Sequence, residues 1–563
     1  MSLDLVIKNG TVIDGSGMPR FRADVGVKDG RITNIGRINE SASETIDAEG
    51  HVVAPGFIDG HTHMDAQIAW DPLGTCSCWH GVTSVVMGNC GFSLAPCKEE
   101  DAGMVMRNLE RAEDISPKAM AAGIKWSWET YSDYLDTVEG LPKGINYAGY
   151  VGHSALRTYV MGERAFSETA SEDDVVAMQA ELRSAIKAGA IGLSTSRTPN
   201  HLTPDDRPVA SRLANWEEIQ QLVGVMGDLN KGIFEIAHEH VGRKPERIAD
   251  YFGRLKQLTL DTGRPITWGM FGSRQAPDYW RQYFDLLDEV ADAGGRMFAQ
   301  VHSRALNTVL SFESNTPFDA WEHWRDLRAL PLEQQKVALR DPETRRKLIE
   351  IGSKAYDGPR LVGAEARPPD WDWFYIMDAP IGPYKTMSQL VAETGKNPVE
   401  TMIDLALDKD LKQFFLQPIA NENQDHVLEM MKHPRAVVTF SDSGAHVSQI
   451  MDSSLQTHLL GHWVREKEAF ALEEAVRMLT MVPATQWGLH DRGLLRCGMA
   501  ADMVVFDPAT ISPQMPEVVS DLPAGETRLK QKADGILATV VNGHQLLANN
   551  EHTGALPGQL LRA

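Results

Sequence analysis

The chain carries near its N-terminus the stretch Ala54-Pro55-Gly56-Phe57-Ile58-Asp59-Gly60-His61-Thr62-His63-Met64-Asp65, in which a short apolar run ends in two histidines. Alternate residues of a β-strand point to the same side, so His61 and His63 are expected to present both imidazoles together. Two neutral imidazoles at the end of a rigid strand form half of a zinc site. The stretch therefore predicts a strand that ends in a metal centre.

Further apolar runs along the chain also end in polar residues. The eight strand candidates are Gly56–Asp59, Ser84–Gly88, Asn146–Gly152, Ala190–Thr195, Gly232–Ala237, Pro265–Met270, Arg296–Val301 and Ala436–Ser441. They alternate with helical stretches that include Glu172–Ala188, Asn215–Leu229 and Tyr279–Ala293. Repeated βα units predict an α/β protein with a (β/α)8 TIM barrel, whose active site lies at the C-terminal ends of the strands.

The two ends of the chain have a different pattern from its centre. Short β-prone runs separated by Asn-Gly and Asp-Gly turns occupy residues 3–35, and similar runs return at Ala501–Asp507 and Thr539–Gly543. We expect a small β-sandwich-like domain formed from both chain ends, by residues 1–53 and 486–563. Residues 54–485 would form the barrel, with an insertion around 305–400 that is too long for an ordinary βα connection.

Composition limits the classes of function. The net charge of −22 disfavours a nucleic-acid partner, because a phosphate backbone requires a basic surface. No run approaches the ~20 apolar residues of a membrane span, and the N-terminus does not resemble a signal peptide. An odd number of cysteines, five, favours reduced thiols and a cytoplasmic location. We expect a small-molecule substrate and leave open whether the protein is a homo-oligomer.

Cys90 follows the second strand candidate in the sequence Gly88-Asn89-Cys90-Gly91. An isolated cysteine here could be inert packing, but a thiolate one strand after His-x-His is a strong zinc ligand. Together with Pro55–His63, this motif resembles the D-aminoacylase (N-acyl-D-amino-acid deacylase) branch of the amidohydrolase superfamily. The resemblance extends to Val151–Arg157 and Gly189–Thr195. It implies that His61, His63 and Cys90 bind zinc.

Asp442 ends the eighth strand candidate, in Phe440-Ser441-Asp442-Ser443, where the superfamily places its catalytic carboxylate. A carboxylate here can touch the metal and serve as general base and then general acid. The alternative interpretation is that Asp442 caps a helix. We therefore expect Asp442 to be both a metal ligand and the proton-transfer group.

The fifth and sixth strand candidates depart from the family, which usually supplies one histidine from each. His238 follows the fifth strand one residue late, so a bulge would be needed to aim it inward as a ligand, and His240 is a weaker candidate. The sixth strand, Pro265–Met270, has no histidine, and His302 after the seventh could compensate. We expect one tightly bound zinc ion and leave a second, weak site open. No lysine follows the fourth strand, which disfavours a carboxylated-lysine bridge.

Substrate recognition is less well defined by the sequence. A substrate carboxylate calls for a bidentate arginine, and the candidates at strand ends are Arg197, Arg274 and Arg304, each of which could instead form a structural ion pair. His153 could hydrogen-bond a substrate or support other site residues. The resulting hypothesis is a zinc-dependent hydrolase that cleaves the C–N amide bond of an N-acyl-D-amino acid or a related N-acyl compound. The alternatives are a hydrolase of another amide, a cyclic amide or a carbamate, and a metal-free, non-catalytic scaffold.

Overall fold

Eight parallel strands form the central sheet of the computed structural model, which describes residues 2–356, 358 and 367–563. In hydrogen-bonding order they are β6 (Phe57–Asp59), β7 (Val82–Met87), β8 (Asn146–Gly152), β9 (Gly192–Ser196), β10 (Ile233–Ala237), β11 (Ile266–Gly269), β12 (Met297–Val301) and β17 (Ala436–Val438). The segments that follow the first and last strands meet, because the His63 N–H donates to the Ser443 carbonyl at 2.7 Å. The expected barrel architecture is confirmed.

The last strand is shorter than the sequence predicts. We expected Ala436–Ser441, but β17 ends at Val438. Phe440 and Asp442 have φ values of 83° and 58°, in the left-handed region, where a strand cannot continue. This turn of the backbone carries the Asp442 side chain over the end of the barrel rather than along its wall.

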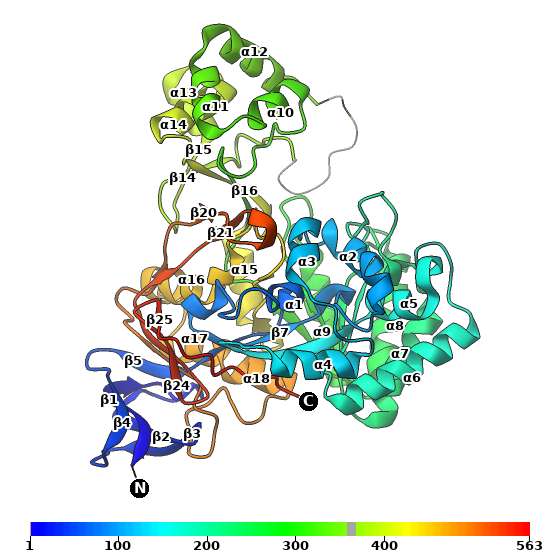
Figure 1. Ribbon diagram of the computed structural model, residues 1–563, viewed down its shortest axis with the longest axis vertical. Helices are drawn as coiled ribbons and strands as arrows, with labels where there is room; N and C mark the ends of the chain where they lie inside the picture. Colours follow the sequence, from blue (N-terminus) through cyan, green and yellow to red (C-terminus); the bar gives the residue numbers. More distant parts are fainter. Residues whose placement is uncertain (1, 357, 359–366) are drawn as a thin grey trace.

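Helices cover the outside of the barrel sheet (Figure 1). They are α2 (Ala102–Glu110), α3 (Pro117–Gly123), α4 (Tyr131–Gly140), α5 (His153–Met161), α6 (Glu172–Ala188), α7 (Trp216–Leu229), α8 (Pro245–Thr262), α9 (Tyr279–Asp292), α15 (Gln424–Lys432), α17 (Leu472–Leu479) and α18 (Met481–Trp487). The helix α6 has the bounds that the sequence predicts. Ser171 and Asp174 form a capping box at its start, and Gly189 ends it with a φ of 115°.

A second sheet contains nine strands from both ends of the chain, as expected. From the N-terminal end come β1 (Leu3–Val12), β2 (Phe21–Lys28), β3 (Arg31–Gly36), β4 (Ala42–Asp47) and β5 (Val52–Pro55). The C-terminal end adds β18 (Met503–Phe506), β23 (Ile536–Val541), β24 (His544–Ala548) and β25 (Glu551–His552). The two halves join where β5 pairs antiparallel with β18. Since β5 leads directly into β6, this sheet anchors the strand that carries the two histidines.

A separate layer lies between β12 and β17, around the insertion that we expected at about residues 305–400. It consists of β13 (Leu306–Leu310), α10 (Glu322–Arg328), α11 (Leu332–Arg340), α12 (Pro342–Gly352), β14 (Tyr375–Met377), β15 (Lys385–Thr386), α13 (Met387–Thr394), α14 (Pro398–Asp408) and β16 (Phe414–Ala420). Residues 357 and 359–366 of the expected insertion lie outside the described residues. The layer has its own hydrophobic core around Phe318 and Trp324 and stands apart from the barrel helices (Figure 1).

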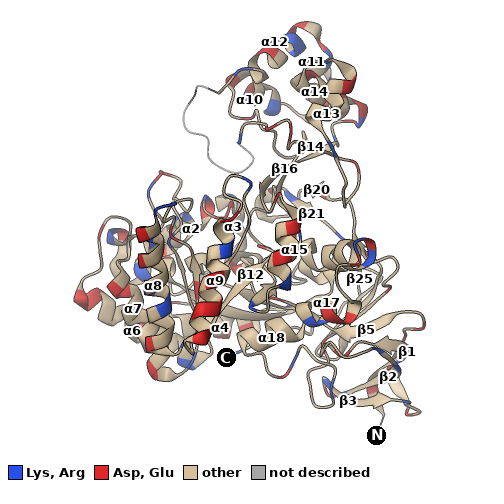
Figure 2. Ribbon diagram, turned by 180° about the vertical axis from the view of Figure 1, so that it is seen from behind, with Lys and Arg blue, Asp and Glu red and all other residues tan. Residues whose placement is uncertain are grey.

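Charged residues are spread over the outer helices rather than gathered on one of them (Figure 2). In this view both acidic and basic segments lie on the outer helices of the barrel. Within the described part of the chain, no helix is long and apolar enough to cross a membrane.

Candidate metal centre

The two histidines of the opening motif meet at the end of β6, inside the barrel. The side chains of His61 and His63 are buried, and their ring centroids lie 5.4 Å apart. Neither ring nitrogen of His63 makes a hydrogen bond with any described residue. The Asp442 and Glu113 carboxylates lie 3.1 and 3.4 Å from its Nε2 as ion-pair partners, and a buried imidazole that makes no hydrogen bond is costly unless another group binds it.

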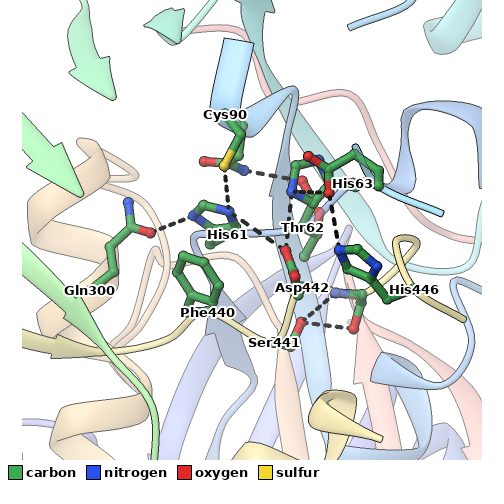
Figure 3. Close-up of polar contacts among 12 residues, drawn as sticks. His61, Thr62, His63, Cys90, Gln300, Phe440, Ser441, Asp442 and His446 are labelled. Atoms are coloured by element: carbon green, nitrogen blue, oxygen red, sulfur yellow. Dashed lines mark hydrogen bonds and ion pairs between the residues drawn. The ribbon is translucent and has the colours of Figure 1, made fainter. Parts of the chain in front are cut away.

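Cys90 approaches His61 from the next strand. It lies in a short turn after β7 with a φ of 55°, and its Sγ atom is 3.6 Å from His61 Nε2 (Figure 3). The Cys90 backbone N–H donates to Glu235 Oε2 at 2.7 Å, which holds this left-handed turn in place. The side chains of His61, His63 and Cys90 form a group whose candidate ligand atoms all lie within 4.8 Å of one another.

Two carboxylates complete the cluster. Asp442 Oδ1 lies 3.1 Å from His63 Nε2 and 3.8 Å from His61 Nε2. Glu113, which the sequence did not single out, lies in the loop after α2 and brings Oε2 to 3.4 Å from His63 Nε2. His63, Glu113 and Asp442 form a second group of candidate ligands.

The environment of His61 fixes its tautomer. His61 Nδ1 lies 2.6 Å from Gln300 Oε1, and the Gln300 amide nitrogen donates to Thr267 Oγ1 at 3.2 Å. An amide oxygen only accepts, so Nδ1 carries the proton and Nε2 turns its lone pair toward Cys90 and Asp442. Phe440 stacks on the ring at 3.7 Å between centroids (Figure 3). This support resembles the outer shell that orients metal-bound histidines.

Electrostatics divides the cluster into neutral and charged members. Burial lowers the pKa of His61 to about 3, so the ring is neutral. Burial also acts on His63, but the carboxylates of Glu113 and Asp442 raise its pKa to about 9. Burial raises the pKa of Glu113 and Glu235 to about 8. A cation would relieve this excess of buried acidic groups.

The donor set fits zinc. Around a tetrahedral zinc ion, ligand atoms lie roughly 3.3–3.8 Å from one another, given bond lengths of about 2.0–2.3 Å. The separations of 3.6 Å for Cys90–His61 and 3.1–3.8 Å for Asp442 to the two histidines are close to this range. Burial raises the pKa of the Cys90 thiol well above its usual value, so a cation must displace the proton to bind sulfur.

His238 is not brought into either ligand group. It follows β10, and its Nδ1 lies 2.9 Å from the Tyr251 hydroxyl while its ring packs on Trp268 and Tyr283. Its buried Nε2 has no hydrogen-bond partner among the described residues. Glu235, on the strand itself, is the residue from β10 that reaches the cluster. Its signal in the sequence was a charged residue within an otherwise apolar strand.

The residues expected to bind substrate have different surroundings. Both ring nitrogens of His153 are engaged inside the protein, with Thr195 Oγ1 at 2.9 Å and Glu218 Oε1 at 2.8 Å. Arg197 pairs with Glu239 at 2.9 Å, and Arg274 pairs with Asp370 and lies over Trp373. These three side chains are committed to partners within the chain.

Arg304 and His302 lie together after β12. The nearly buried Arg304 guanidinium donates to Ser454 Oγ at 3.0 Å and lines a cavity of about 690 Å³ with Tyr375 and Tyr384 of the insertion layer. His302 Nε2 is 3.8 Å from Asp452 Oδ1, and His302 belongs to neither ligand group.

A cavity of about 350 Å³ opens beside the cluster and is lined largely by aromatic and apolar side chains. Cys90, Glu235 and His201 border it on the cluster side, and Phe271 and Tyr279 are part of its wall. Its size and its apolar wall with a few converging polar groups are typical of a small-molecule site.

Comparison with known proteins agrees with this geometry. The model of the amidohydrolase family matches residues 44–546, and that of the urease alpha-subunit N-terminal domain matches residues 1–56. A D-aminoacylase of Alcaligenes xylosoxydans xylosoxydans is 28% identical, over 99% of this chain and 97% of that protein. An N-acyl-D-aspartate deacylase of the same organism is also 28% identical, over 99% and 95%.

A solved D-aminoacylase structure, described as defining a novel subset of amidohydrolases, superposes with a TM-score of 0.66. It is 25% identical, and the match covers 100% of both chains. The resemblance to the D-aminoacylase branch that the sequence motifs indicated is therefore confirmed. Since the family model spans most of its length, this chain belongs to the amidohydrolase family.

Proposed function

We propose that this protein is a zinc-dependent hydrolase that cleaves the C–N amide bond of an N-acyl-D-amino acid or a related N-acyl compound. The observation that carries the proposal is the meeting of His61, His63 and Cys90 as one group of candidate ligands, with Asp442 beside both histidines, at the C-terminal ends of three barrel strands. Membership of the amidohydrolase family and similarity to D-aminoacylase and N-acyl-D-aspartate deacylase over nearly the whole chain support the choice of bond.

In this proposal His61, His63, Cys90 and Asp442 hold one zinc ion. When bound, zinc acts as a Lewis acid toward the amide carbonyl and makes water more acidic. The Gln300 hydrogen bond fixes the proton on His61 Nδ1, which would leave the lone pair of Nε2 free to bind the ion. Buried neighbours such as Phe440 restrict bulk water, which strengthens each electrostatic interaction in the site.

Asp442 is the group that we assign to proton transfer. Burial disfavours its charge, but the neighbouring His63 holds the pKa of Asp442 well below its usual value, so the carboxylate is ionised. An ionised carboxylate can accept the proton of the attacking water and then donate it to the departing nitrogen. Its placement on a left-handed turn beside both histidines suits this role.

For the substrate carboxylate we retain Arg304 among the predicted binders. Its nearly buried guanidinium donates to Ser454 and lies 4.0 Å from Asp452 Oδ1, and it lines the cavity of about 690 Å³ rather than the cavity bordered by Cys90 and Glu235. His153, Arg197 and Arg274 each pair more closely with a carboxylate of the chain. A cytoplasmic location is part of the proposal, supported by the five free cysteines.

The decisive experiment combines metal analysis with a substrate panel. Protein purified without chelators is analysed by mass spectrometry for metals and assayed on N-acyl-D-amino acids, their L-enantiomers and small cyclic imides. We expect about one zinc ion per chain, release of free D-amino acid, and loss and recovery of activity on chelation and zinc addition. Absence of zinc, with no activity restored by added zinc, would refute the proposal. Preference for cyclic imides would favour the alternative substrate class.

A further inference from the structure

The cavity of about 350 Å³ beside the metal centre has an aromatic wall. Phe271, after β11, and Tyr279 and Tyr283 of α9 line it. The two tyrosine rings pack edge to face at 5.4 Å between centroids, and their hydroxyls lie 3.1 Å apart. Phe440, which stacks on His61 (Figure 3), meets Phe271 edge to face at 4.8 Å. The aromatic wall therefore continues from the cavity to the metal centre.

Two polar side chains of the same cavity have atoms that no described residue satisfies. Glu235 is fully buried, and while its Oε2 accepts the Cys90 backbone N–H, its Oε1 has no hydrogen-bond partner among the described residues. The same is true of His238 Nε2, whose ring is held through Nδ1 by the Tyr251 hydroxyl. Buried polar atoms are normally paired, so these two atoms indicate that a bound molecule faces this wall.

The cavity offers little positive charge to an anion. None of the described residues that line it is Lys or Arg, and burial lowers the pKa of His201 and His238 to about 3, so both rings are neutral. Water surrounds the exposed His240, and Arg197 is engaged by Glu239. A carboxylate placed here would lose its hydration without gaining a cation, which is costly. An aromatic ring would instead gain edge and face contacts with the wall.

The two ends of the proposed substrate fit different cavities. Arg304, the residue retained for the substrate carboxylate, lines the cavity of about 690 Å³, and no described residue lines both cavities. The acyl end is then left for the cavity beside Cys90. Pockets of roughly 300–1,000 Å³ accommodate whole small molecules, so this cavity is larger than an acetyl group requires.

We infer that the cavity beside Cys90 and Glu235 binds the acyl group of the substrate and selects an aromatic acyl group over a small or an acidic one. Phe271, Tyr279 and Tyr283 are the residues that determine this preference. The inference rests on the proposed function, because it takes the substrate to be an N-acyl compound.

A set of three substrates tests the preference. The zinc-loaded enzyme is assayed on the N-phenylacetyl, N-acetyl and N-succinyl derivatives of one D-amino acid, and kcat/KM is compared within the same preparation. One methylene in a hydrophobic pocket contributes roughly 10–200-fold to such discrimination. We therefore expect kcat/KM for the phenylacetyl compound to exceed that for the acetyl compound at least tenfold, and the succinyl compound to be the poorest.

Phe271→Lys supplies the cation that the wall lacks. Phe271 is half-buried and belongs to neither ligand group, so a flexible lysine can be accommodated there. We expect the succinyl-to-acetyl ratio of kcat/KM to rise at least tenfold and the preference for phenylacetyl to fall. Phe21→Lys, at an exposed phenylalanine of β2, is the matched control and should keep the original ratios. Circular dichroism checks folding, and if Phe271→Lys does not fold, Tyr279→Lys at the start of α9 replaces it.

Three outcomes would overturn the inference: an acetyl compound hydrolysed best, a succinyl compound hydrolysed as well as the phenylacetyl one, or ratios unchanged in the lysine variant. Failure of the proposed function has a different signature, namely that none of the three compounds is hydrolysed. Binding of phenylacetamide and succinamate to the zinc-loaded protein, measured by isothermal titration calorimetry, then decides. Tighter binding of phenylacetamide that Phe271→Lys weakens would support the aromatic preference of the cavity, and equal binding of the two would refute it.

Discussion

Histidines follow several strands of this barrel, but those after β6 and those after β8 and β10 have different surroundings. His63, after β6, is buried and its ring nitrogens make no hydrogen bond with the described residues, while Nε2 lies 3.1 Å from Asp442 Oδ1 as an ion pair. His153, after β8, is equally buried, yet Thr195 and Glu218 engage both of its nitrogens. His238, after β10, is held by Tyr251 at one nitrogen. Position at a strand end therefore does not make a ligand, and the partners of the ring decide its role.

The largest effect is expected at Asp442, which follows β17 and lies beside the two histidines after β6. Asp442→Asn removes the proposed proton acceptor while keeping the side-chain shape, so kcat should fall by about 10²–10⁴-fold. Steady-state kinetics with an N-acyl-D-amino acid and metal analysis of the same sample measure this. Asp408→Asn, an exposed change in the insertion layer, is the control. Unchanged kcat in Asp442→Asn would exclude it as the proton-transfer group.

A change at Glu218, the partner of His153 after β8, should lower the free energy of unfolding rather than the catalytic rate. Glu218 pairs with the buried Arg157 as well as with His153. Glu218→Gln leaves the arginine charge without its partner, and we expect a loss of about 3–5 kcal/mol in the free energy of unfolding. Urea denaturation measures it, and KM at a temperature well below melting should not change. Glu217→Gln, on the exposed side of the same helix, is the matched control. If Glu218→Gln instead raised KM and left the stability unchanged, the original prediction that His153 binds substrate would be supported.

The parts of the site that the sequence predicted are those encoded in short motifs at strand ends. His61, His63, Cys90 and Asp442 each follow an apolar run, and barrel geometry alone brings such ends together. The strand β8 and the helix α6 match their expected bounds because a continuous apolar run and helix capping are local signals. The shortened β17 was not predictable, because its end depends on left-handed residues that are not glycines.

Glu113 could not be found in this way. It comes from a loop more than 300 residues before His446, and their proximity depends on tertiary docking of that loop. The hydrogen bond that occupies His153 Nε2 likewise could not be predicted, because its partner Glu218 lies 65 residues further along the chain. Pattern identifies residues able to ligate or bind, but only the packed structure shows which of their atoms are still available.

The pH dependence of stability should separate the metal-free from the zinc-loaded protein. His63 stabilises the fold fully below its unfolded pKa of 6.5, and this contribution is lost as the pH rises through the folded value of about 9. Glu113 and Glu235, with pKa values raised by burial to about 8 from 4.5, change in the same direction. The His63 contribution alone amounts to on the order of 3 kcal/mol lost by the metal-free protein between pH 6.5 and 9, and the two glutamates add to this loss below pH 8.

Zinc binding displaces these protons, so the difference in Tm between zinc-loaded and metal-free protein should widen across the same interval. Scanning calorimetry at several pH values measures it. Zinc-treated Cys90→Ser serves as the control, since weakened zinc binding should narrow the difference. A difference in Tm that is constant with pH would show that zinc does not bind at these protonated groups.

The smallest expected effect is a loss of zinc affinity when the Gln300 hydrogen bond to His61 is removed. A change at His238 serves as the comparison. Gln300→Leu removes the acceptor that fixes the Nδ1 proton of His61, and zinc affinity should fall about 10–100-fold, as when other supports of metal-bound histidines are lost. His238→Gln should leave the affinity unchanged, because the His238 ring is held by Tyr251 and lies outside both ligand groups. Competition with a chromophoric chelator measures both. An equal loss in His238→Gln would make His238 a ligand, and β10 would then contribute to the centre through a histidine as well as through Glu235.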